Sequence, residues 1–184
     1  MVATRLLTAE DLEAMGPEAE KRYELIDGVL VEVEGVGGRH GGINSEIVSA
    51  LHVFTRSRRL GRVLSADTRF ILGRDPDLVL MPDVSFIRAE RIPAGGLWDR
   101  MVPVPPDFAT EIASPNDTGA EVRRKAQRYL DAGVRLVWIV WPRRHEVSVF
   151  RPGQPEAVFR EGDELAGGDV IPEFRLAVAA IFAD

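Results

Sequence analysis

The chain has 184 residues, of which 45% are hydrophobic and 28% charged, as is typical of a globular domain rather than a disordered or membrane protein. No apolar run reaches the roughly 18 residues of a membrane helix, the N-terminus turns acidic too early for a secretory signal, and no cysteine is present. We therefore expect a cytoplasmic protein without membrane contact, folded as a single domain over residues 1–184. The net charge of −6 argues against a strong sequence-independent grip on nucleic acid, although residues 56–62 and 121–128 could form local basic surfaces.

A short helix and a β-hairpin are predicted near the N-terminus. Thr8 and Asp11 have the spacing of a capping box, so a helix should begin there and end near residues 16–17. Residues 22–33 predict a hairpin, because the Asp-Gly dipeptide at 27–28 favours a type I′ turn between two apolar-rich strands.

Residues 35–42, GVGGRHGG, are rich in glycine. One interpretation is a phosphate cradle at the start of the next helix. The stretch lacks the GK[ST] ending of a P-loop, so a flexible connection is the favoured interpretation. After it, apolar residues recur at helical spacing and predict an amphipathic helix to about Arg59.

Strand patterns dominate from residue 61 onward. They occur at residues 62–66, 68–72, 83–87, 107–113 and 146–150. Residues 88–106 are rich in proline and glycine and predict a long loop, whereas residues 114–134 predict a capped helix ending at Gly133. Residues 135–142 are continuously apolar, so this strand should be central in its sheet. With short peripheral strands at the C-terminus, the order indicates a mixed α/β fold.

Two acidic residues in this part of the chain could share one edge of the sheet. Asp83 leads one strand, and Glu111 lies within the next, beyond the long loop. If the strands are neighbours, both carboxylates reach the same edge, and Ala109 and Ala113 leave space around Glu111 for an ion or water. Mg²⁺ typically takes one or two protein carboxylates and keeps water and phosphate in the rest of its shell. The pair therefore indicates a magnesium site.

Lys125 adds a cation to this pair. The chain has 23 basic residues besides histidine, and only Lys21 and Lys125 are lysines. At 100° per residue, Lys125 lies beside Val122 and Tyr129, on the face of its helix that should contact the sheet. An ammonium there needs a carboxylate partner, because burying an isolated charge is costly.

Several motifs together resemble one family of nucleases. They are YELIDG at 23–28, PDVSFI at 82–87, EIASPND at 111–117 followed by Lys125 and Tyr129, and GVRLVWIV at 133–140. Their order and spacing resemble the Uma-type restriction endonuclease family, a branch of the PD-(D/E)XK nuclease superfamily, from about residue 23 to residue 150. The resemblance implies a restriction-endonuclease-like mixed central β-sheet flanked by helices, here with an N-terminal helix and β-hairpin.

The resemblance also implies a metal site at the edge of the sheet. Asp83 matches the metal-binding aspartate and Glu111 the second carboxylate, and the implied metal site consists of Asp83, Glu111 and Ile112 with Mg²⁺ or Mn²⁺. The superfamily places a lysine two residues after the second acid, where this chain has Ala113. In this family the lysine maps onto Lys125, on the following helix.

Two further residues match the family. Glu24 corresponds to an acidic residue of the N-terminal region and would position a second ion or the lysine. His40 corresponds to a histidine before the next helix, although a lone histidine is more often structural.

The implied activity is metal-dependent hydrolysis of DNA phosphodiester bonds by an endonuclease. A homodimer is expected by analogy with nucleases that cut both strands of a duplex. One alternative is a non-catalytic nucleic-acid-binding or assembly protein that retains the fold. Another is a small-molecule phosphodiesterase, which the acidic net charge favours.

Overall fold

The computed structural model describes residues 5–15, 22–33 and 35–183. The helices are α1 (Ala9–Ala14), α2 (Gly38–Arg58), α3 (Gly119–Asp131) and α4 (Val178–Ile181), with a 3₁₀ turn, η2, at Ala89–Arg91. The strands are β1 (Tyr23–Ile26), β2 (Val29–Glu32), β3 (Gly61–Ser65), β4 (Phe70–Gly73), β5 (Leu78–Leu80), β6 (Val84–Arg88), β7 (Phe108–Ile112), β8 (Leu136–Trp141), β9 (Glu146–Phe150), β10 (Ala157–Arg160), β11 (Glu164–Ala166) and β12 (Arg175–Ala177).

The larger sheet has six strands in the order β10-β9-β8-β7-β6-β3. Its neighbours are antiparallel, except that β7 and β8 are parallel and are joined by the crossover helix α3. Strand β8 is buried along its whole length in the interior of the sheet, as its continuous apolar run predicts. The mixed sheet and its flanking helices agree with the expected architecture.

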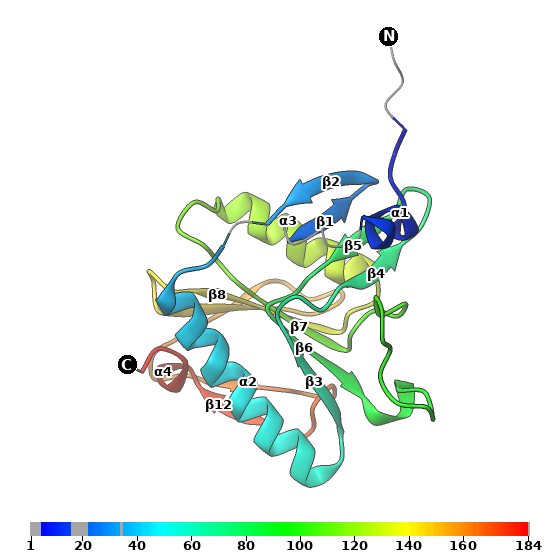
Figure 1. Cartoon of the computed structure of the whole chain (residues 1–184). Coiled ribbons are helices and arrows are strands. Elements are labelled where there is room, and N and C mark those ends of the chain that lie inside the picture. The colour runs from blue at the N-terminus through cyan, green and yellow to red at the C-terminus, as the bar shows by residue number, and fades with distance from the viewer. Residues whose placement is uncertain (1–4, 16–21, 34, 184) are drawn as a thin grey trace.

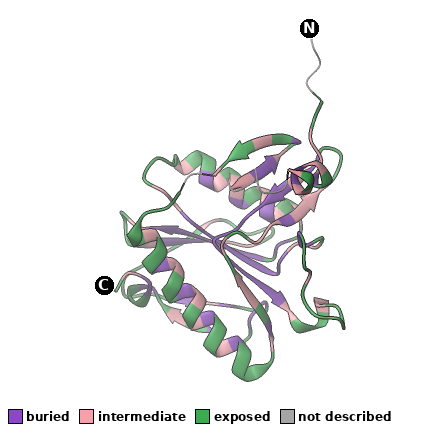
Figure 2. Cartoon of the chain, in the orientation of Figure 1, coloured by how far each residue is buried: buried purple, intermediate pink, exposed green. Residues whose placement is uncertain are grey.

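Helices cover both faces of this sheet (Figure 1). Alternate side chains of β8 point to opposite faces. Trp138 packs in a core with Ile47 of α2, and Ile139 packs in a second core with Ala126 of α3. The central strands are accordingly buried, whereas the outer surfaces of α2 and α3 are exposed (Figure 2). Ala109 belongs to the α3 core, so the alternating residues of β7 place Glu111 on the same face as α3.

A second sheet has the order β2-β1-β5-β4 and contains the predicted hairpin. Asp27 and Gly28 both have positive φ, 54° and 76°, as the type I′ turn requires. The sequence prediction did not include β5. This three-residue strand pairs with β1 through Leu25 and Val79 and with β4 on its other side, so it connects the hairpin to β4 in one sheet.

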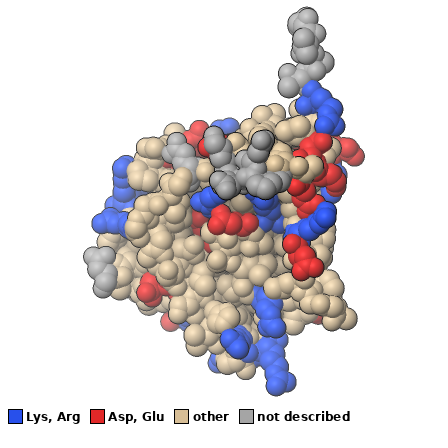
Figure 3. Space-filling view, viewed as in Figure 1, with Lys and Arg blue, Asp and Glu red and all other residues tan. Residues whose placement is uncertain are grey.

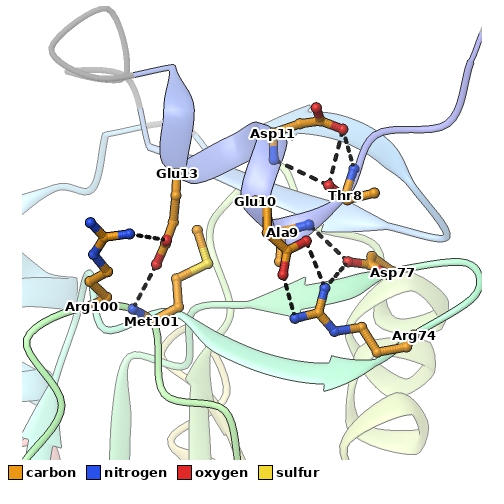
Figure 4. A network of polar contacts seen from close by, with 9 residues as sticks. All are labelled: Thr8, Ala9, Glu10, Asp11, Glu13, Arg74, Asp77, Arg100 and Met101. Carbon is orange, nitrogen blue, oxygen red and sulfur yellow. Dashed lines mark hydrogen bonds and ion pairs between the residues drawn. The ribbon is translucent and has the colours of Figure 1, made fainter.

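Helix α1 is attached to this second sheet by polar contacts (Figure 4). Its predicted capping box is present, with Thr8 as the N-cap and Asp11 at the third helical position. Arg74 lies 2.8 Å from Glu10 and 2.7 Å from Asp77, and we call these three residues the Arg74 cluster. Asp77 also accepts a hydrogen bond from the Ala9 amide, at 2.8 Å.

The structure corrects the interpretation of the glycine-rich segment as a flexible connection. Helix α2 begins within it, at Gly38, and therefore includes His40. Ile43, Ile47 and Leu51 anchor one face of α2 in the core, so tertiary packing outweighs the low helix propensity of glycine. The expected end of the first helix near residues 16–17 and the second lysine, Lys21, lie outside the described residues.

Candidate active site

The strands that carry the two predicted carboxylates are direct neighbours. Strands β6 and β7 pair antiparallel, with Val84 opposite Thr110. The Asp83 amide continues this pairing by donating to the Thr110 carbonyl at 3.0 Å. The buried Asp83 carboxylate then accepts a hydrogen bond from the Ile112 amide through Oδ2, at 2.7 Å. Backbone pairing therefore places Asp83 beside the end of β7, one residue from Glu111.

Glu111 is buried beneath α3, and two side chains of that helix contact its carboxylate. The Tyr129 hydroxyl donates to Oε1 at 2.6 Å, and the Lys125 Nζ lies 3.0 Å from Oε2. Lys125 and Tyr129 are four residues apart, so they project from the same face of the helix. Because each oxygen has its own partner, the orientation of the carboxylate is determined by α3.

Lys125 also contacts the second sheet. Its Nζ lies 2.8 Å from Oε1 of Glu24 on β1, and this oxygen accepts a further hydrogen bond from the Met81 amide at 2.7 Å. We call Glu24, Glu111 and Lys125 the Lys125 cluster. Its members come from β1, β7 and α3. The ammonium of Lys125 on α3 therefore contacts a carboxylate from each of the two sheets.

Burial dominates the electrostatics of the Lys125 cluster. Burial raises the pKa of Glu111 above its ordinary value, although the nearby ammonium of Lys125 acts to lower it. The carboxylates of Asp83 and Glu24 add to the rise. Burial lowers the pKa of Lys125, but the carboxylates of Glu111 and Glu24 more than offset it, so the net shift is upward. Burial also raises the pKa of Tyr129. Lys125 and Tyr129 therefore stay protonated at neutral pH and act as donors.

The structure gives His40 and Tyr129 contacts that the sequence did not predict. His40 Nε2 lies 3.0 Å from Oδ1 of Asp83, so each oxygen of that aspartate has a partner. The sequence placed Tyr129 on the inward face of its helix and in the family motif, but it assigned no polar contact to the hydroxyl. The spacing of Lys125 and Tyr129 was the signal for a shared role, because residues four apart on a helix meet the same neighbour.

Every predicted site residue lines one cavity of about 630 Å³, a volume in the usual range of ligand sites. These residues are Glu24, Asp83, Glu111, Ile112 and Lys125. Among the residues that the structure describes, no three His, Cys, Asp or Glu side chains converge to hold a metal ion by themselves. Any ion bound here therefore needs ligands beyond the side chains, such as a backbone carbonyl, water or substrate.

Comparisons with known proteins agree with this architecture. The model of the Uma2 family, described as a putative restriction endonuclease, matches residues 9–179. A crystal structure of a putative nuclease belonging to DUF820 from Anabaena variabilis superposes with a TM-score of 0.84 and 26% identity, over 96% of this chain and 97% of that chain. This match confirms the fold class predicted from the sequence.

None of the curated proteins matches the chain significantly. Within the described part of the chain, no helix combines the length and apolarity needed to cross a membrane.

Proposed function

The chain belongs to the Uma2 family of putative restriction endonucleases, and from this membership we propose that it is a metal-dependent endonuclease that hydrolyses DNA phosphodiester bonds. The observation that carries the proposal is the meeting of Asp83, Glu111 and Lys125 in one cavity at the end of β7. Two carboxylates can hold a divalent cation, and an ammonium can stabilise charge that develops on a phosphate, so this set suits phosphodiester hydrolysis assisted by a metal ion.

The residues present fit Mg²⁺ or Mn²⁺. Such ions prefer oxygen ligands, and Mg²⁺ commonly uses only one or two protein carboxylates. Asp83 and Glu111 supply these carboxylates. The amide and carbonyl of one strand residue point to the same side, and the Ile112 amide faces Asp83, so the Ile112 carbonyl is available as the third ligand. The buried carboxylates also outnumber the ammonium, so a bound cation would offset their mutual repulsion.

When bound, the ion would polarise the scissile phosphate and lower the pKa of a water ligand. The protein's own groups account for the remaining requirements. Asp83 and Glu111 hold their carboxylates in fixed orientations, because the Ile112 amide, His40 and Tyr129 donate to or contact them. Lys125 orients the attacking water or offsets the charge that develops on the phosphate.

Glu24 positions the lysine in this scheme. Its Oε1 lies 2.8 Å from the ammonium, which also contacts Glu111, and the Met81 amide donates to that oxygen. Without Glu24, Lys125 would keep its contact with Glu111 but lose its second anchor.

One observation favours a non-catalytic alternative. Both carboxylate contacts of Lys125 are made within the fold, as in a buried structural ion pair. A protein that uses the cluster only to join its two sheets would bind nucleic acid or assemble without hydrolysing a phosphodiester.

A cleavage assay tests the proposal. Purified protein is incubated with plasmid, single-stranded and branched DNA in Mg²⁺, in Mn²⁺ and in EDTA, with Asp83→Asn in parallel. The proposal predicts cleavage that requires both the cation and Asp83. Cleavage that persists in Asp83→Asn would overturn the site, and DNA binding without cleavage of any substrate would favour the alternative.

A further inference from the structure

A second cavity of about 590 Å³ adjoins the one that contains Asp83 and Glu111. Its walls are the start of α2, the segment between β7 and α3, and the turn between β8 and β9. His40, Ala113 and Asn116 are among the residues that line both cavities. The two cavities therefore share a wall, and the proposed catalytic groups line the first of them.

Three exposed arginines line the second cavity. Arg39, Arg143 and Arg144 are all exposed, and none forms an ion pair with another of the residues that the structure describes. In the first cavity, Arg22 and Arg128 each pair with an aspartate, whereas the exposed Arg124 forms no ion pair among the described residues. The charge of the second cavity is thus available to an anion.

The wall beneath these arginines is held by a polar network. The buried indole of Trp141 donates through Nε1 to Ser148 Oγ at 2.9 Å, and Ser148 donates to Glu156 at 2.6 Å. Arg123 of α3 closes the network with two hydrogen bonds to Glu156, at 2.8 and 3.0 Å. The guanidinium of Arg144 stacks over the fixed indole, 5.3 Å from its ring centre.

The location of the positive charge is informative because the chain as a whole is acidic. Its net charge is −6, and on the face shown in Figure 3 the basic side chains form separate groups rather than one broad surface. The stretches 56–62 and 121–128, which the sequence suggested as basic surfaces, do not supply these three arginines. Arg39 comes from α2, whereas Arg143 and Arg144 come from the turn between β8 and β9. Only the folded chain brings the three arginines to one cavity.

We infer that the second cavity binds the phosphate backbone of the substrate strand on one side of the scissile bond, with Arg39, Arg143 and Arg144 contacting its phosphates. The inference rests on the proposed nuclease function and adds where the strand lies. Guanidinium groups match phosphate oxygens in planar, two-pronged hydrogen bonds. A strand whose scissile phosphate reached Asp83 and Glu111 would continue through the shared wall at His40 into the second cavity.

Binding of labelled DNA in EDTA tests the inference without cleavage. Fluorescence anisotropy is followed against salt concentration for wild type, for the triple variant Arg39→Ala/Arg143→Ala/Arg144→Ala, and for Arg62→Ala. Arg62 is an exposed arginine of β3 that lines neither cavity, and it serves as the matched control. Losing three phosphate contacts should reduce the salt slope by about 2 on single strands and nearly 3 on duplex. Arg62→Ala should keep the wild-type slope, and so should Arg143→Lys, which retains the charge.

A second measurement separates strand binding from damage to the catalytic groups. Bis(p-nitrophenyl) phosphate is a small diester that does not extend beyond the first cavity. The triple variant should lose at least about tenfold more kcat/KM on DNA than on this ester, because only the long substrate contacts the arginines. Equal losses on both substrates would overturn the inference.

The remaining outcomes distinguish the two proposals. If wild type binds DNA but does not cleave it, and the triple variant loses binding, the nuclease proposal fails and the strand-binding inference stands. If wild type cleaves DNA and the triple variant keeps the wild-type affinity and salt slope, the inference fails and the nuclease proposal stands.

Discussion

The protein contains two clusters built from the same parts, one cation between two carboxylates. In the Arg74 cluster the cation and Glu10 are exposed and only Asp77 is buried, whereas the side chains of the Lys125 cluster are all largely buried. In the Arg74 cluster, Glu10 is 68% exposed, and its hydrogen bonds to Arg74 lower its pKa to about 2. In the Lys125 cluster, Glu111 is 11% exposed, and burial raises its pKa above the ordinary value despite the nearby ammonium. The pKa values of Glu10 and Glu111 thus shift in opposite directions, because Glu10 stays hydrated whereas burial penalises the charged form of Glu111.

This difference indicates which cluster can do chemistry. An exposed ion pair contributes little stability and is replaceable. A buried one is sensitive to the loss of either partner, and groups with strongly perturbed pKa values gather at functional sites. The comparison therefore agrees with the catalytic role proposed for the Lys125 cluster and with an attachment role for the Arg74 cluster. The substitutions below, in order of expected effect, test that assignment.

The largest effect is expected from the proposed metal ligands. Asp83→Asn and Glu111→Gln should each reduce metal-dependent DNA cleavage by more than about 100-fold, because even outer contacts of metal ligands are worth roughly 10–100-fold. Circular dichroism should show the fold retained. Asp77→Asn, in the Arg74 cluster, is the matched control and should cleave at the wild-type rate. Equal activity of Asp83→Asn and Asp77→Asn would contradict the proposal that Asp83 is a metal ligand and Asp77 is not.

Removal of the buried ammonium should affect both stability and turnover. Lys125→Met leaves Glu24 and Glu111 buried without a cation, and breaking such a pair costs about 3 kcal/mol or more. Urea titration measures this loss. Turnover should fall further than the affinity for Mn²⁺, because Lys125 is assigned to the water and phosphate rather than to the ion. A parallel fall in turnover and Mn²⁺ affinity would count against that role.

Tyr129→Phe should have an intermediate effect. It removes one hydrogen bond to Glu111 and leaves the ring packed, so the free energy of unfolding should fall by about 1–2 kcal/mol. Cleavage should fall several-fold, because Glu111 loses one of the contacts that orient it. Stability measured in urea and kcat measured on the same preparation check both parts. Unchanged kcat with reduced stability would make Tyr129 purely structural.

The smallest effect is expected in the Arg74 cluster. Arg74→Met should lower Tm by about 3 °C, because the pair with exposed Glu10 is worth little and the buried Asp77 keeps its hydrogen bond from the Ala9 amide. Differential scanning calorimetry measures Tm, and the cleavage rate should equal that of wild type. A loss as large as that of Lys125→Met would show that burial does not separate the two clusters.

The site could be largely predicted from the sequence because short-range periodicities determine which side chains share a face. The two-residue period of β7 places Glu111 toward α3, and the helical period of α3 places Lys125 toward the sheet. The link to Asp83 required the two strands to be neighbours, which the strand pattern left conditional and the family resemblance supported. The hydrogen bond between Tyr129 and Glu111 was not predicted, because the four-residue spacing from Lys125 indicates a shared helix face but does not identify the partner of the hydroxyl.

Other parts could not be predicted because their cause is long-range. Strand β5 has three residues and exists by pairing with β1 and β4. The start of α2 in a glycine-rich segment depends on the packing of residues one and two turns later. The Arg74 cluster joins residues 64 positions apart on exposed surfaces, where charge follows no periodic pattern.

The most direct test of the central claim is the position of a bound cation. Crystals of the wild-type protein soaked in Mn²⁺ should show an anomalous peak between the carboxylates of Asp83 and Glu111 and next to the Ile112 carbonyl, and Asp83→Asn crystals should lack it. A Mn²⁺ peak elsewhere, in a protein that cleaves DNA with Mn²⁺, would contradict the account.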